Sequence, residues 1–113
     1  MARRAWAAKN GDQLVAFIRS YVAAMDWLQQ PANKDEAVAI YMKHVSGARP
    51  AAQKAYEVMF AEKEGFQRRA KLDLEGCRTV LKLRSEFAKP EKNLGDPMKY
   101  VDESFYRKAV QQP

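Results

Sequence analysis

Residues 26–38, DWLQQPANKDEAV, hold both a stop signal and an immediate restart signal for helical structure. Pro31 disfavours helical geometry at the residue before it, so a preceding helix must end there. Asn33 is a favourable N-cap, and Glu36 three residues later completes the pattern of a capping box. The stretch therefore predicts a tight corner between two helices, with Trp27 packed over the corner or against a second surface.

Apolar residues recur at helical spacing on both sides of this corner. Upstream they predict a helix from residue 13 to residue 28 or 29, with Asp12 as its N-cap. Downstream a second stripe leads to Gly47, a plausible C-terminal stop. Pro50 then predicts the first residue of a third helix. The upstream stripe consists of Leu14, Phe17, Ile18, Tyr21, Val22, Met25 and Leu28.

The C-terminal half shows three further helix starts, each marked by an aspartate. Asp73 predicts the cap of a fourth helix over residues 74–88. Asp96 before a proline predicts a short helical turn, and Asp102 predicts the cap of a last helix over residues 103–110. These signals predict helical structure in the second half of the chain as well.

The fold class expected from these patterns is all-α. We expect a bundle of four main helices, a short helical turn and a C-terminal helix, with an additional turn at residues 4–9. No β-alternation of useful length interrupts the pattern. With 113 residues, the chain is long enough for one domain with its own core, so residues 1–113 are expected to form a single helical domain.

Composition narrows the classes of protein further. A chain that is 47% hydrophobic and 30% charged is neither disordered nor fibrous. Its longest apolar-rich stretch is interrupted by Arg19 and Ser20, so no insertion into a membrane is expected. The N-terminus starts with two arginines but lacks the hydrophobic segment of a signal peptide. The chain as written is therefore expected to stay in the cytoplasm.

The net charge of +6 invites a nucleic-acid-binding hypothesis. However, the basic residues are spread along the chain and mixed with 14 acids. The densest basic group is Arg68, Arg69 and Lys71, and no aromatic pair, glycine-rich loop or zinc-ligand spacing accompanies it. A solvated basic surface is the simpler interpretation.

No residue pattern predicts catalysis, so the chain is not expected to be an enzyme. His44 is the single histidine and Cys77 the single cysteine, and neither has partners at metal-ligand spacing. We expect no catalytic residue, no metal site and no cofactor. Tyr21, Tyr41 and Tyr56 all lie on helical stripes, where core packing is favoured over a ligand-binding box.

Four segments, taken together, resemble the C-terminal part of the substrate-binding proteins of ABC transporters, of the nitrate, sulfonate, taurine and thiamine-precursor type. The order and the spacing of the segments carry the resemblance, which covers nearly all of this chain and about the last third of a family member. In chain order they are RRAWAAKNGDQLVAFIRSYVAAMDWL (3–28), PANKDEAVAIYMKHV (31–45), LDLEGCRTVLKLRSEF (72–87) and DPMKYVDESFYRKAV (96–110).

The resemblance implies the helical region of a two-lobed periplasmic solute-binding protein. In that family the C-terminal helices support one α/β lobe, and the cleft residues come largely from earlier segments. It therefore implies no ligand-binding residue here, and it assigns the ABC permease and a small anionic or organic solute to the full-length parent in the periplasm. It also implies that Trp27 faces parts of the fold that other segments supply.

Two alternatives remain beside this hypothesis. The first is an independent helical interaction or oligomerisation module, in which exposed apolar helix faces drive self-association into a dimer or larger oligomer. The second, based on charge alone, is a basic nucleic-acid-binding domain whose affinity would fall steeply with salt.

Overall fold

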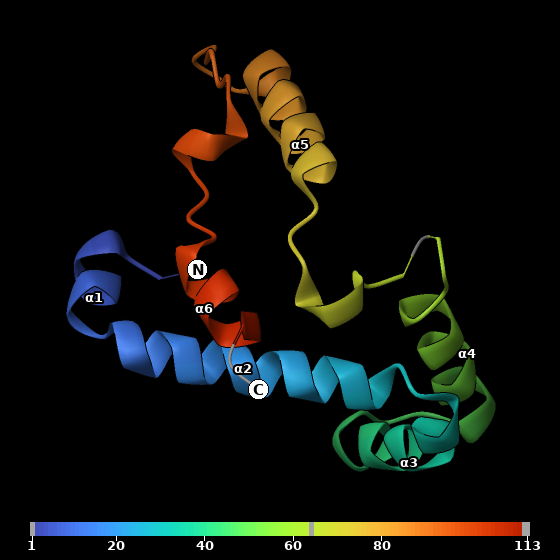
Figure 1. Ribbon diagram of the computed structural model, residues 1–113. Helices are drawn as coiled ribbons and strands as arrows, with labels where there is room; N and C mark the ends of the chain where they lie inside the picture. Colours follow the sequence, from blue (N-terminus) through green and yellow to red (C-terminus); the bar gives the residue numbers. More distant parts are fainter. Residues whose placement is uncertain (1, 64, 112–113) are drawn as a thin grey trace. The chain divides into compact units, whose positions relative to one another are not determined.

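The computed structural model describes residues 2–63 and 65–111 (Figure 1). Within these residues the chain is helical and contains no β-strand, which confirms the all-α prediction. The α-helices are α1 (Arg4–Lys9), α2 (Gly11–Leu28), α3 (Lys34–His44), α4 (Arg49–Met59), α5 (Leu74–Phe87) and α6 (Ser104–Gln111). Short 3₁₀ turns are η1 (Pro31–Asn33), η2 (Arg68–Ala70) and η3 (Pro97–Lys99).

The described chain divides into two compact units. Unit 2 is the continuous segment Ala16–Lys71, and unit 1 joins the segment through Val15 with the segment from Leu72 onward. The expectation of one domain over residues 1–113 stays a prediction.

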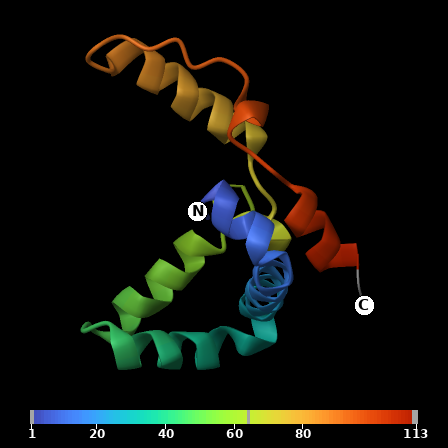
Figure 2. The same ribbon diagram turned by 90° about the vertical axis from the view of Figure 1, so that its left-hand side faces the viewer.

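Unit 2 is built around a helical hairpin that follows the corner. Figure 2 shows α3 and α4 as two neighbouring helices joined by the short connection 45–48. The buried apolar residues of this unit come from all three of its helices. Helix α2 contributes Val22 and Met25, which lie on one face at the spacing i, i+3. Val38 is the most completely buried, at 1% exposure. The buried alanines, Ala37 and Ala52, lie on α3 and α4, where small side chains permit close approach of helices.

The corner is closed by side chains that bind the last carbonyl groups of α2. After Leu28 the backbone of Pro31 offers no N–H, so the final carbonyls need other donors. The Asn33 side-chain amide donates to the carbonyl of Trp27 at 2.9 Å, and the Tyr56 hydroxyl on α4 donates to the carbonyl of Leu28 at 2.5 Å. Trp27 itself is half-buried. The predicted corner is thus confirmed.

The capping box predicted for Asn33 and Glu36 is wrong. Asn33 has no side-chain cap hydrogen bond, and its backbone is already helical at φ −94° and ψ 0°. A capping side chain normally leaves from extended backbone, whereas here the 3₁₀ turn η1 precedes α3 directly. The Asn33 amide instead reaches back to the helix before the corner.

The predicted N-cap of the first long helix is also displaced. Helix α2 begins at Gly11, so Asp12 lies inside its first turn and not before it. The amide of Leu14 donates to the carbonyl of Asn10 at 3.0 Å, so the helical hydrogen bonding begins two residues earlier than expected. The carboxylate of Asp12 still lies near the positive end of the helix dipole.

Unit 1 brings the N-terminal segment against the C-terminal helices. The guanidinium of Arg4 donates to the carbonyl of Lys99 at 2.9 Å. A Cβ placed on Gly11 would lie 3.5 Å from the ring of Phe105, so the start of α2 packs closely on α6. Ala7 and Ala109 are buried in this unit. Residues almost one hundred positions apart in the sequence therefore share one packed region.

The predicted aspartate caps of unit 1 are confirmed. The carboxylate of Asp73 accepts from the amide of Gly76 at 2.9 Å at the start of α5. Asp96 accepts from the amide of Met98 at the start of η3, and Asp102 accepts from the amide of Ser104, the first residue of α6. Each carboxylate satisfies one of the free N–H groups of a helical first turn.

Candidate functional site

The core of the described residues is small compared with the apolar surface that they leave exposed. Of the described residues, seven hydrophobic ones are buried, and four of these are alanines. The same part of the chain exposes fourteen large hydrophobic side chains, among them Phe17 at 68% and Phe87 at 72%. Single exposed apolar residues are ordinary, but contiguous groups mark interaction sites. The places where such residues gather are therefore the candidate sites.

One such group lies on α5. Val80, Leu83 and Phe87 follow one another at i, i+3 and i+7, which places them on one face of the helix. They are 60%, 50% and 72% exposed. We name these three residues the α5 face. Leu81 and Ser85 are less exposed, so α5 shows one side to its own unit and a second apolar side outward.

A second group forms a pocket in unit 2, which we name the apolar pocket. Its cavity volume is about 270 Å³, and every described residue that lines it is apolar or aromatic. Six of the residues that line it are Tyr21, Met25, Tyr41, Tyr56, Phe60 and Phe66. The three tyrosines that the sequence placed on separate helical stripes thus meet around one cavity. The three tyrosines therefore lie where the helices of unit 2 pack together, and they line a cavity that a ligand could enter.

A second cavity, which we name the basic pocket, adjoins the first. Its volume is about 300 Å³, and Phe60 and Phe66 line both cavities. Gln29, Arg68 and Lys71 are among its other lining residues. The two aromatic rings therefore form the wall between an apolar space and a space lined by cations.

This wall is fixed by contacts on several sides. The ring of Phe60 packs at 4.8 Å from that of Tyr56 and edge-on at 6.0 Å from that of Phe66. The amide of Phe66 donates to the carbonyl of Met59 at 2.7 Å, and Gln29 donates to the carbonyl of Phe66 at 3.2 Å. The segment after α4 is thereby tied to the ends of both α4 and α2.

Gly65 permits the close turn that brings Phe66 back to α4. A Cβ at this position would lie 2.7 Å from the carbonyl oxygen of Met59, closer than Cβ atoms approach in real structures. Any other residue would therefore displace the segment that forms the wall.

The basic segment after the wall adopts an uncommon backbone. Arg69 and Ala70 have φ values of 54° and 53°, the left-handed region that residues with a Cβ rarely adopt. The guanidinium of Arg69 lies 3.7 Å from the carboxylate of Asp26 on α2. The turn thus directs Arg69 toward α2, while its neighbours Arg68 and Lys71 line the basic pocket.

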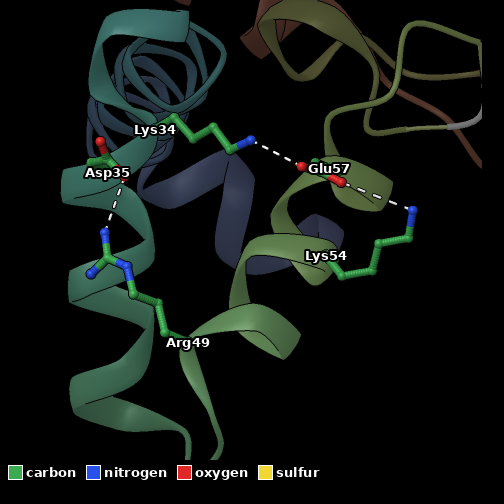
Figure 3. A network of polar contacts seen from close by, with 5 residues as sticks. All are labelled: Lys34, Asp35, Arg49, Lys54 and Glu57. Atoms are coloured by element: carbon green, nitrogen blue, oxygen red, sulfur yellow. Dashed lines mark hydrogen bonds and ion pairs between the residues drawn. The ribbon is translucent and has the colours of Figure 1, made fainter.

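An ion-pair network links α3 to α4 (Figure 3). The ammonium of Lys34 lies 3.0 Å from the carboxylate of Glu57, which also lies 3.9 Å from Lys54. Arg49 pairs with Asp35 at 3.0 Å. All five side chains are substantially exposed, so the network orients the hairpin more than it stabilises it. Hydrogen bonding and charge from Lys34 hold the pKa of Glu57 below its ordinary value.

Neither the histidine, His44, nor the cysteine, Cys77, lies in a described cluster of metal-binding side chains. His44 ends α3 and is exposed, and Cys77 is a half-buried free thiol on α5. Among residues 2–63 and 65–111, no three histidine, cysteine or acidic side chains lie close enough together to hold a metal ion. The hydrogen bonds from Ser104 lower the pKa of Asp102, which is a capping residue.

The sequence patterns indicated the tyrosines and the basic cluster. They did not indicate Phe60 and Phe66, which line both the apolar pocket and the basic pocket. Phe60 directly follows α4, and Phe66 lies six residues further along the chain. Their juxtaposition depends on the reversal of the chain between them, which local periodicity does not encode. The signal that could have indicated it is the pair of aromatic residues on either side of Gly65 in the stretch FAEKEGF.

Comparison with known proteins found no matching protein family, no matching curated protein and no matching solved structure. None of the helices in the described part of the chain has the length and hydropathy that crossing a membrane requires. The resemblance to solute-binding proteins stays a prediction.

Proposed function

We propose that this chain is a non-enzymatic packing region, the helical C-terminal part of a solute-binding protein of an ABC importer, in which apolar helix faces cover an α/β lobe. The exposed α5 face is the observation that carries the proposal. The order of the four segments quoted above supports the assignment to this class of protein. The solute, the permease and the periplasmic location belong to the proposal through the parent protein.

The energetics of the α5 face favour a covering partner. Complete burial of a Val, Leu or Phe side chain contributes roughly 1.5–3 kcal/mol. With half or more of each side chain still exposed, covering Val80, Leu83 and Phe87 would contribute about 3–5 kcal/mol. That gain is comparable to a large part of the stability of a small domain. A 14-residue helix also depends on packing for its stability, since helices of this length are marginal alone.

A reconstitution experiment tests this proposal. The chain is co-expressed with the lobes of a nitrate- or sulfonate-type solute-binding protein whose corresponding C-terminal helices have been deleted. We expect a 1:1 complex by light scattering coupled to size exclusion. The Leu83→Glu/Phe87→Glu variant should lose the complex, and Lys82→Glu, on the same helix but off this face, should retain it. If the chain forms no complex with the lobes, with or without the α5 substitutions, the assignment is refuted.

Self-association is the second candidate function, and the same face favours it. A helix face of this kind can be covered by a second copy when no lobe is present. In this case light scattering of the chain alone would give a dimer or larger oligomer, and Leu83→Glu/Phe87→Glu would give a monomer. A monomer from the unsubstituted chain at high micromolar concentration would exclude an independent oligomerisation module.

A further inference from the structure

The apolar pocket and the basic pocket of unit 2 together have the form of a small-molecule site. Ligand sites are mostly apolar cavities with a few polar groups that fix orientation, and they begin near 300 Å³. Each cavity is close to this lower bound, and the two share the Phe60–Phe66 wall. Because Phe60 and Phe66 line both cavities, a single ligand that lies along these two rings would contact both cavities.

The apolar side favours an aromatic or branched hydrocarbon group. Aromatic rings from α2, α3 and α4 line this cavity, through Tyr21, Tyr41 and Tyr56. The hydroxyl of Tyr56 is already engaged by the carbonyl of Leu28, which leaves its ring as the contact surface. Ring faces and edges of this kind pack well against another planar apolar group.

The basic side favours a negatively charged group. Arg68 and Lys71 line it, and within the described residues no ion pair engages either one. Glu62 is the acid among the described lining residues, so cations predominate there. A guanidinium and an ammonium together bind a carboxylate by charge-assisted hydrogen bonds, the guanidinium in a bidentate manner.

We propose that unit 2 binds a small amphipathic carboxylate, with an aromatic or branched apolar group in the apolar pocket and the carboxylate on Arg68 and Lys71. The wall residues Phe60 and Phe66 contact both halves of the ligand. This site lies in unit 2, whereas the proposed function rests on the α5 face of unit 1, so either can fail without the other.

Three naphthalene compounds of nearly equal size test the proposal on the full chain. They are 2-naphthoate, the neutral 2-naphthamide and the cationic 2-naphthylmethylammonium, each titrated while backbone amide signals are followed by heteronuclear NMR. We expect 2-naphthoate to shift signals of residues that line the two pockets, with a Kd of about 1 mM or tighter for a ligand of this size. The amide should bind roughly fivefold more weakly, because it forgoes two partly exposed ion pairs.

Two variants separate the contributions of the two pockets. Arg68→Gln/Lys71→Gln should abolish the preference for naphthoate over naphthamide, whereas Lys89→Gln/Lys92→Gln, which removes two cations from unit 1, should retain it. Phe66→Ala changes an exposed ring and should weaken all three compounds. Equal binding of the three compounds, signal shifts outside unit 2, or no shift with naphthoate would each overturn the proposal.

Discussion

The hydrogen bond from Tyr56 to Leu28 provides a measurable test of how the corner is held. Replacing Tyr56 by Phe keeps the ring against Phe60 and removes only the hydroxyl that reaches the end of α2. A neutral intramolecular hydrogen bond contributes about 1 kcal/mol net, and a buried carbonyl left without a partner costs somewhat more. Because this site is only partly buried, water can replace part of the loss, and we expect destabilisation of about 1 kcal/mol.

Urea unfolding, followed by the indole N–H signal of Trp27, measures this loss within unit 2. With a slope of about 1 kcal/mol per molar urea for a small unit, the midpoint should fall by roughly 1 M. Tyr21→Phe is the matched control, since the described structure shows no hydrogen bond from the Tyr21 hydroxyl, and it should stay within about 0.5 kcal/mol of the parent. Equal midpoints for the two variants would refute this account of the corner.

Three further predictions concern caps and charges. Asp73→Ala should destabilise α5 by about 1 kcal/mol, seen as reduced helicity and a lower unfolding midpoint of unit 1, and Asp73→Asn should recover most of the loss. Lys34→Met should raise the pKa of Glu57 toward its ordinary value in a carboxyl NMR titration, and an unchanged pKa would contradict the ion pair. The pKa of Asp102 is lowered in the folded chain, so its stabilising contribution should be present above the unfolded pKa and lost as pH falls through the folded one. Asp102→Asn should remove this acid dependence from the amide signals of α6, and its persistence would assign the dependence to other groups.

The helices could be predicted from the sequence because their signals are local. The aspartates at 73, 96 and 102 act on amides two or three residues ahead, so each cap follows from the residue and its position. Pro31 likewise stops the preceding helix through its own ring. Asn33 could not be assigned so simply, because the carbonyl it binds belongs to the preceding helix and competes with the cap role.

The pockets could not be predicted because they depend on contacts between segments far apart in the chain. Gln29 meets the backbone of Phe66 across 37 positions, and Tyr56 meets that of Leu28 across 28. Periodicity placed the tyrosines on apolar stripes, but it gave no information on which stripes face one another. The left-handed backbone at Arg69 and Ala70 is equally absent from local signals, since neither residue is a glycine or an asparagine.

The side-chain bonds of the corner also have a consequence for the order of events during synthesis. Both side-chain donors to the last carbonyls of α2 lie downstream of it, at Asn33 and Tyr56. A nascent chain that has left the ribosome only through α3 has the first donor but not the second. The end of α2 therefore reaches its final bonded state only after α4 has emerged, and until then its open carbonyl group is available to water or to a chaperone.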